Sequence, residues 1–376
     1  MIPIRLKFFL ASLTFLVVLA ALRLSLASRT SAGPIPQADA ICSSLKSANA
    51  PGAAVLVLKN GKAVFEKGYG VRNVRTREPI NATTNFRLAS VTKQFTAMAI
   101  MLLVHDGKLR YEDALTDIFP SFPDYGKRIT IRNLLNHTSG LLDYEDLMEH
   151  HKFAVPPGTF FQINDDQVLE LLEEQTSTKF QPGSRWDYSN SGYVVLGLVV
   201  KKVSGEAFGD FLRDRIFLPL GMKDTVLYEK GKNEVQDRAY GYSEENSHWR
   251  ETDQSSTSAT QGDGGMYSSV ADLAKWDQAL RSHHLLSESE MATALTPVNV
   301  PGVEEPDKTA AAYGFGWFLN PYKGHQRMWH YGETVGFRTA IERFPSDKLT
   351  VIVLANRADL DSNALALRLA DVFLSR

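Results

Sequence analysis

Residues 86–95, FRLASVTKQF, and the apolar run at 96–104, TAMAIMLLV, determine how the rest of the chain is expected to fold. The run has one polar residue in nine, which predicts a helix over 90–104 that is buried on every side. Asp106 and Gly107 follow as a stop signal. We therefore expect this helix at the centre of the molecule, with other elements packed around it.

Ser90 and Lys93 stand three residues apart at the start of this helix, so their side chains share one face. The positive end of the helix dipole and burial both disfavour a charged lysine, which lowers the pKa expected for Lys93. A neutral amine can take the proton of the serine hydroxyl, and the backbone N–H of Ser90 in a first turn is free to face an oxyanion. This S-x-x-K spacing is typical of serine acyl-transfer enzymes. A second copy at 43–46, SSLK, lies in a polar segment and is interpreted as a solvated helix face.

Residues 186–193, WDYSNSGY, contain the second candidate group. Tyr188 carries an ionisable phenol, and Asn190 both accepts and donates hydrogen bonds. The two residues are separated by one position on a loop before a predicted helix, so both side chains can face one cleft. A phenol near an amine can pass protons in either direction. The alternative is that Tyr188 only caps a buried loop.

Residues 328–337, MWHYGETVGF, contain the third candidate group, at the end of a predicted strand. Gly332 lets a substrate approach the backbone closely. We expect the edge of this strand beside Ser90, where the N–H of Glu333 supplies a second oxyanion donor and the strand pairs with an extended acyl group. His330 is expected to hydrogen-bond the substrate or to tune the phenol of the second group. A structural histidine is the alternative.

The hydrophobic pattern elsewhere predicts an α+β sandwich. Strands are expected on both sides of the turn Asn60-Gly61 and again near the C-terminus, where a final helix closes the chain. Two N-terminal and four C-terminal strands would complete one antiparallel sheet flanked by helices, with a large, mainly helical insertion over about 107–290. The polar stretch 243–260 is expected to be a mobile loop. The predicted strands are 53–58, 63–70, 314–319, 327–331, 337–344 and 350–355, and the predicted helices include 165–174, 191–203, 208–217 and 359–374.

Residues 1–32 are interpreted as a secretory signal. Arg5 and Lys7 form a basic start, 8–22 is an apolar run with two hydroxyl residues in it, and small residues follow. A run of this length is short for a spanning helix, which needs about 20 residues. The chain is therefore expected to be exported to the periplasm or secreted, with an uncleaved anchor, and hence a membrane attachment, as the alternative. Residues 33–376 are expected to form one composite domain.

Composition excludes several kinds of partner. The formal net charge of the 376 residues is −2, and nothing resembles the basic footprint of a nucleic-acid-binding protein. Cys42 is the one cysteine, which excludes an internal disulfide and a cysteine-based zinc site. The chain lacks the G-x-S-x-G and H-E-x-x-H motifs of two other hydrolase classes. A small molecule or a peptide is therefore the expected partner, and the oligomeric state stays open.

The three groups, in this order and spacing, resemble the motifs of the penicillin-recognising serine hydrolases. Within that family the chain is similar to the class C β-lactamase-like branch, which includes D,D-carboxypeptidases, D-aminopeptidases and esterases. The resemblance covers about residue 51 to the C-terminus. It rests on Ser90-x-x-Lys93, Tyr188-x-Asn190 and His330-x-Gly332, with support from LLNHTSGL at 134–141 and GGMYSS at 264–269.

This resemblance implies a β-lactamase/transpeptidase-like fold and a role for each matched residue. No metal and no cofactor are implied. His137 and the Gly264-Gly265 loop would shape the cleft. The implied roles are nucleophile for Ser90, activating base for Lys93, proton relay for Tyr188, holder of the acyl amide for Asn190, and oxyanion donors for the N–H groups of Ser90 and Glu333.

The match departs from the family at His330, where β-lactamases and carboxypeptidases of this branch usually have lysine. Histidine is mostly neutral near pH 7, since its unperturbed pKa is about 6.5, so it suits a substrate carboxylate less well. We therefore expect an exported esterase or D-amino-acid peptidase that works through an acyl-enzyme. A cell-wall D,D-carboxypeptidase or class C-type β-lactamase is the second hypothesis, and a non-catalytic penicillin-binding sensor is the third.

Overall fold

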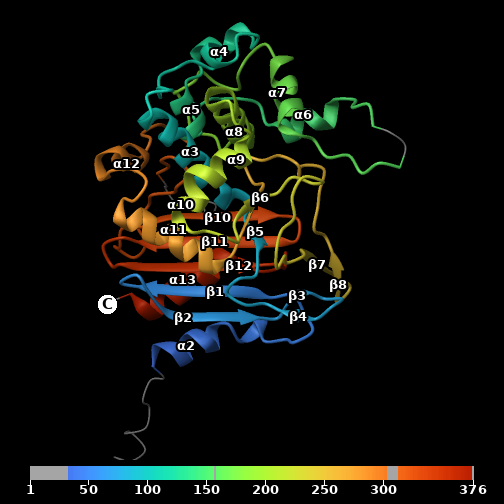
Figure 1. Ribbon diagram of the computed structural model, residues 1–376, viewed down its shortest axis with the longest axis vertical. Coiled ribbons are helices and arrows are strands. Elements are labelled where there is room, and N and C mark those ends of the chain that lie inside the picture. The colour runs from blue at the N-terminus through green and yellow to red at the C-terminus, as the bar shows by residue number, and fades with distance from the viewer. Residues whose placement is uncertain (1–32, 156–157, 303–311, 375–376) are drawn as a thin grey trace, which may run out of the picture.

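An antiparallel sheet of five strands runs through the molecule in the order β10-β11-β12-β1-β2 (Figure 1). The computed structural model describes residues 33–155, 158–302 and 312–374. A strand from the N-terminal part of the chain and one from the C-terminal part lie side by side in this sheet. Strand β12 pairs with β1 from Ala53 opposite Ala355 to Lys59 opposite Leu349. The strands are β1 (Ala53–Lys59), β2 (Lys62–Tyr69), β10 (Met328–Thr334), β11 (Phe337–Phe344) and β12 (Leu349–Ala355).

The turn between β1 and β2 is the one that the sequence predicts. Asn60 and Gly61 both have positive φ, 52° and 74°, as a two-residue hairpin turn requires. Strand β1 is buried over almost its whole length, because the sheet is covered on both faces.

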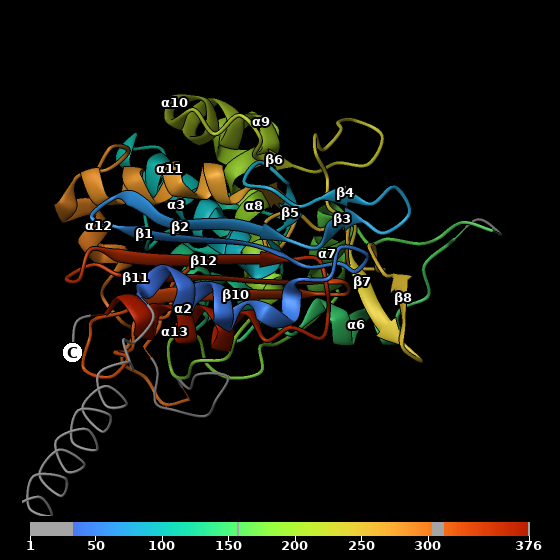
Figure 2. The same cartoon turned by 90° about the horizontal axis from the view of Figure 1, so that it is seen from below.

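Side chains of β1 and β12 alternate between two hydrophobic cores. One core contains Val55, Val57 and Val353 and lies under α2 (Pro34–Ile41) and α13 (Ser362–Phe373). The other contains Leu56 and Ile352 and the helices α3 (Lys93–His105), α8 (Asn190–Ser204) and α11 (Val270–Ser282). Figure 2 shows the two groups of helices on opposite sides of the sheet. The expected α+β sandwich is confirmed.

The segment between β2 and β10 is mainly helical, as expected, and three of its short strands, in the order β5-β9-β6, form a small separate sheet. Its α-helices are α4 (Leu115–Ile118), α5 (Ile131–Leu135), α6 (Tyr144–His150), α7 (Asp165–Glu173), α9 (Phe208–Leu212), α10 (Leu218–Leu220) and α12 (Glu288–Ala294), in addition to α3, α8 and α11. Its strands are β3 (Val71–Asn73), β4 (Glu78–Pro79), β5 (Phe86–Arg87), β6 (Val226–Leu227), β7 (Tyr242–Glu245), β8 (His248–Glu251) and β9 (Met266–Ser268). Short 3₁₀ turns are η1 (Ser43–Leu45), η2 (Ala89–Thr92) and η3 (Asp124–Arg128), and Arg213–Phe217 is a π-helical turn.

Two predictions about strands and loops are wrong. Residues 314–319 form a tight turn instead of a strand, because Gly314 N–H bonds to the carbonyl of Trp317 and Gly316 has a φ of 76°. The main sheet consequently has three C-terminal strands and not four. Within 243–260, β7 and β8 pair as a hairpin, so this stretch is not simply a polar loop.

The helix predicted over 90–104 begins later than expected. Helix α3 starts at Lys93, and Ser90 belongs to the preceding η2 turn. Every α3 residue from Lys93 to Leu103 is buried, as the apolar run predicts. The predicted signal, 1–32, lies outside the described residues. In the ranges that the structure describes, no helix combines the length and apolarity needed to cross a membrane.

Candidate active site

Ser90 lies in a turn whose backbone is held in an unusual conformation. Ala89 has a φ of 48°, a left-handed value that a residue other than glycine adopts at an energetic cost. Both backbone groups of Leu88 are hydrogen-bonded. Its N–H donates to the carbonyl of Met266 in β9 (2.8 Å), and its carbonyl accepts from Thr339 Oγ1 in β11 (2.7 Å). These two strands, β9 and β11, therefore fix the position of the serine.

Lys93 lies directly beneath this serine, with a side chain that is 0% exposed. Its Nζ is 3.0 Å from Ser90 Oγ, 2.9 Å from Asn190 Oδ1 and 2.9 Å from the carbonyl oxygen of Asp263. The last two oxygens can only accept hydrogen bonds. The two N–H groups of a neutral amine would satisfy them, and its lone pair would be left to face the Ser90 hydroxyl. The geometry thus fits a lysine that accepts the serine proton.

Burial lowers the pKa of Lys93 to about 8. Removal from water disfavours the charged amine, and the negative charges of Asp263, Asp143 and Glu145 oppose this effect. About one tenth of the amine is consequently neutral at pH 7, and this is the form that a general base requires.

Tyr188 packs against the same amine. Lys93 Nζ lies 4.8 Å from the centre of the tyrosine ring. Burial raises the pKa of Tyr188 above its usual range, while a hydrogen bond with Ser90 acts in the opposite direction. The phenol is therefore protonated near neutral pH and lies on the same side of Lys93 as Ser90, where it can donate a proton.

His137 holds the loop that carries Tyr188 and Asn190. Its Nδ1 accepts the N–H of Ser189 (3.1 Å), and its own carbonyl accepts the N–H of Asp187 (3.0 Å). Its ring also packs on the Tyr188 ring, with 4.4 Å between their centres. This buried histidine positions the loop, in agreement with the cleft-shaping role that the resemblance implies.

His330 lies beside Tyr188, with 6.3 Å between the ring centres, and is 0% exposed. Its Nδ1 is 2.6 Å from the carbonyl of Tyr331, so this nitrogen carries the proton, and Nε2 then accepts from the hydroxyl of Tyr313 (3.1 Å). Burial and the nearby Lys93 lower the pKa of His330 to about 3. The ring is neutral with both nitrogens occupied, which favours a positioning role; substrate contact stays a prediction.

Gly332 lies where β10 touches the serine turn. A Cβ atom at this position would lie 2.3 Å from the carbonyl oxygen of Leu88 and 3.1 Å from the nitrogen of Ser90, so only glycine allows this close approach. Strand β10 is the edge of the main sheet, and it lies beside Ser90 as predicted. The side chain of Glu333 is exposed and lies 3.8 Å from Arg338.

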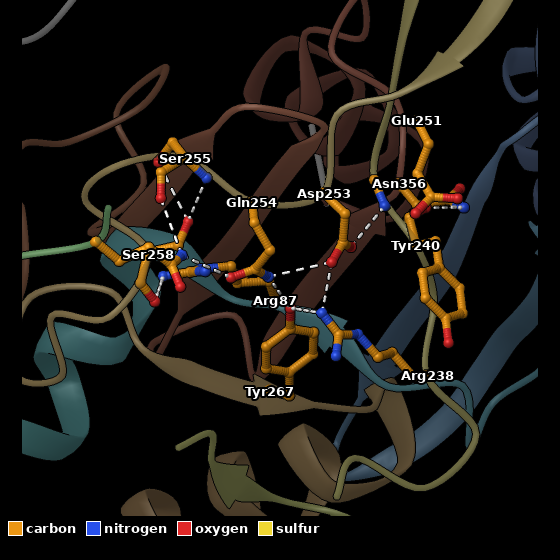
Figure 3. Close-up of polar contacts among 12 residues, drawn as sticks. Arg87, Arg238, Tyr240, Glu251, Asp253, Gln254, Ser255, Ser258, Tyr267 and Asn356 are labelled. Atoms are coloured by element: carbon orange, nitrogen blue, oxygen red, sulfur yellow. Dashed lines mark hydrogen bonds and ion pairs between the residues drawn. The ribbon is translucent and has the colours of Figure 1, made fainter. Parts of the chain in front are cut away.

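The carbonyl of Asp263 is a contact that sequence reasoning did not identify. A network around strand β9 anchors the preceding loop, as Figure 3 shows: Arg87 Nη2 donates to Ser258 O (3.0 Å), Gln254 Nε2 donates to the hydroxyl of Tyr267 (3.4 Å), and Arg238 pairs with Asp253. The glycine pair at 264–265 follows Asp263 directly. This pair belongs to a stretch that resembles the family, and it was the one signal in the sequence that pointed to this loop.

Across the described part of the chain, no cluster of three or more histidine, cysteine, aspartate or glutamate side chains is arranged to hold a metal ion. Ser90 has the amine of Lys93 beside it, with the phenol of Tyr188 nearby, and the amine in turn contacts one amide oxygen and one backbone carbonyl. Such a set can activate a hydroxyl and move protons.

Comparisons with known proteins agree with this arrangement. The Beta-lactamase family model matches residues 38–374. Penicillin-binding protein 4* of Bacillus subtilis is 35% identical over 322 residues, 81% of this chain and 68% of the relative. A D-aminopeptidase of Brucella anthropi is 29% identical over 81% of this chain, which spans 56% of that protein's length. The crystal structure of a penicillin-binding protein from Bacillus halodurans superposes with a TM-score of 0.73 at 28% identity, covering 89% of this chain and 97% of that one. The chain therefore belongs to the β-lactamase family and is a serine hydrolase.

Proposed function

We propose that this protein hydrolyses an ester or amide of a D-amino acid through an acyl-enzyme on Ser90. The observation that carries the proposal is the 3.0 Å contact between Ser90 Oγ and the fully buried amine of Lys93. A buried amine with a lowered pKa in contact with a hydroxyl is the arrangement that activates a serine nucleophile.

In the proposed reaction, Ser90 Oγ attacks the substrate carbonyl carbon while Lys93 Nζ accepts the hydroxyl proton. The tetrahedral oxyanion is stabilised by the N–H groups of Ser90 and Glu333. Collapse of the intermediate breaks the bond to the leaving group, which takes a proton from the phenol of Tyr188. Water then attacks the acyl-enzyme ester on Ser90 and gives a proton to the Tyr188 phenolate. Lys93 returns its proton to Ser90 Oγ as the acyl group leaves, which regenerates the free enzyme.

The state of His330 supports the choice of substrate. A neutral histidine with both ring nitrogens occupied offers no charge to a substrate carboxylate, which β-lactams and D-Ala-D-Ala peptides carry. The similarity to a D-aminopeptidase points in the same direction. An ester or amide of a D-amino acid satisfies both observations.

A fluorophosphonate probe and a substrate panel test this proposal. Ser90-dependent labelling is expected, together with turnover of D-amino-acid amides and p-nitrophenyl esters, and both should vanish in Ser90→Ala. Rapid nitrocefin hydrolysis with negligible ester turnover would contradict the substrate assignment. Unchanged labelling of Ser90→Ala would reject Ser90 as the nucleophile.

A D,D-carboxypeptidase or β-lactamase is the second candidate, favoured by the similarity to penicillin-binding protein 4* over most of the chain. It predicts a penicilloyl adduct on Ser90, either long-lived or turned over, that mass spectrometry would detect. A non-catalytic penicillin-binding sensor would form the adduct and turn over no substrate. Acylation of Ser90 requires an activating base in a sensor as well, so the presence or absence of substrate turnover decides between this candidate and the enzyme.

Export is also part of the proposal. The basic start and apolar run of residues 1–32 are typical of a secretory signal. Intact-mass measurement of the protein recovered outside the cytoplasm should show a chain that begins near residue 33. A full-length mass in the membrane fraction would support the uncleaved anchor instead.

A further inference from the structure

A cavity separate from Ser90 lies beside helices α7, α8 and α9, which pack against one another (Figure 1). Its volume is about 250 Å³, below the roughly 300–1,000 Å³ of pockets that hold drug-sized ligands. The cavity therefore suits a small molecule. Its walls include Asp165, Lys201, Phe208, Glu229 and Gln261.

Asp165, the first residue of α7, supplies a buried carboxylate to this cavity. The residue is only 8% exposed, and its Oδ1 accepts the backbone N–H of Gln261 (2.9 Å). Among the described residues, no group donates a hydrogen bond to Oδ2, and no basic side chain lies within ion-pair distance of the carboxylate. One oxygen thus has a structural role, and the other is left for a ligand.

The charges that line the cavity do not balance. The carboxylates of Asp165, Asp166 and Glu229 line it together with the ammonium groups of Lys201 and Lys232. Lys201 pairs with Asp166 (3.5 Å), and Lys232 pairs with Glu229. Asp165 is left without a partner of opposite charge, and the positive end of α7 offsets only about half an elementary charge. The cavity consequently favours a cation.

Burial makes the unpaired charge of Asp165 costly. Burial raises the pKa of this carboxyl well above its usual range, while the N–H of Gln261 and the charge of Lys201 act in the opposite direction. A cation bound at Oδ2 would stabilise the ionised form and would offset part of the cost of removing the carboxylate from water.

Another part of the wall is apolar. Gly197 and Leu198 of α8, together with Ala207 and Phe208 at the start of α9, line the cavity. Their side chains offer no hydrogen bond, so they suit a short hydrocarbon chain. We propose that this cavity binds a small organic cation, a primary ammonium or a guanidinium on a short hydrocarbon chain, with Asp165 as its counter-charge.

The proposed site is distinct from the catalytic one. Ser90, Asn190 and Tyr188 surround the amine of Lys93, and none of these three residues lines the cavity. Binding of a cation at Asp165 should therefore be independent of the chemical state of Ser90.

Two ligands that differ in charge test the proposal. n-Butylammonium chloride carries the cation, and n-butanol has the same carbon chain without it. Isothermal titration calorimetry should show at least tenfold tighter binding of n-butylammonium to the wild type. Asp165→Asn should lower that affinity at least tenfold, the effect of one charged hydrogen bond. Asparagine keeps an oxygen that can accept the N–H of Gln261, so the variant should fold, and its circular dichroism spectrum checks this.

Glu170→Gln is the matched control, because Glu170 is exposed on the same helix and does not line the cavity. This variant should bind n-butylammonium as tightly as the wild type does, and so should protein labelled at Ser90 by the fluorophosphonate probe. Equal affinities for the two ligands, an unchanged affinity in Asp165→Asn, or loss of binding on labelling would each overturn the proposed site. None of these results bears on the acyl-enzyme, whose own test is the labelling of Ser90.

Discussion

The hydroxyl of Tyr313 lies 3.1 Å from Nε2 of His330, and both side chains are 0% exposed. The resemblance to the family rests partly on the position of His330, where a lysine is common. In this chain the rings of Tyr188, Tyr313 and Phe318 surround the fully buried His330.

We therefore expect His330→Lys to destabilise the protein without creating a β-lactamase. A second ammonium would be buried near Lys93, which should lower the free energy of unfolding by about 3 kcal/mol or more. Denaturant unfolding measures this loss, and nitrocefin turnover should stay negligible. His284→Lys, at an exposed histidine, is the control and should leave stability within about 0.5 kcal/mol. Efficient nitrocefin hydrolysis by His330→Lys would contradict this account.

The pH profile of kcat/KM should show one acidic limb with an apparent pKa near 8. The free enzyme is active with neutral Lys93, whose pKa is lowered to about 8, so activity should rise with pH through this value and fall tenfold per unit below it. His330, with a pKa of about 3, stays neutral over the whole range and should add no step. A limb centred near 6.5 would indicate a titrating histidine and contradict the assignment.

Gly332→Ala should disrupt the serine turn. Its new Cβ would lie 2.3 Å from the carbonyl oxygen of Leu88, so β10 or the turn must shift. We expect kcat/KM to fall at least 100-fold, since displacements of about 1 Å cost that much. Gly209→Ala is the control, because its Cβ would make only ordinary contacts at 3.4 Å or more. Retained activity in Gly332→Ala would show that the close approach is dispensable.

Features set by residues close together in the chain were predicted from the sequence, and features set by contacts between distant residues were not. The hairpin at Asn60-Gly61 and the buried helix after Lys93 follow from local patterns, and they appear as predicted. The 3₁₀ turn at Ser90 was not predictable, because long-range bonds to Leu88 from two strands impose it. The turn at 314–319 has a strand-like composition, and a glycine with positive φ overrides it.

The candidate site shows the same division. The spacing of Ser90 and Lys93 was visible in the sequence, and the structure brings the two side chains into contact. The contribution of Asp263 was hidden, because its backbone carbonyl contacts the lysine and a backbone contact leaves no mark on residue type, although the glycine pair at 264–265 pointed to the loop. The partners of His330 were equally hidden, since Tyr313 stands directly before the turn at 314–319 that composition predicted as a strand.

Tyr188→Phe isolates the proton-transfer step. The variant keeps the ring that packs on Lys93 and His137 and loses the hydroxyl that bonds to Ser90. We expect kcat to fall by about 10²- to 10⁴-fold, the usual contribution of a general acid or base. KM should change little because the cleft keeps its shape.

The matched control is Tyr193→Phe, which removes a phenol from the same aromatic group. The Tyr193 hydroxyl donates to the carbonyl of Leu135 (2.7 Å), so its loss should cost about 1 kcal/mol of stability and leave kcat largely unchanged. A leaving group of low pKa needs no proton, so Tyr188→Phe should slow an amide substrate more than a p-nitrophenyl ester. Equal losses for both substrates would remove Tyr188 from leaving-group protonation and restrict it to the activation of Ser90 or of the hydrolytic water.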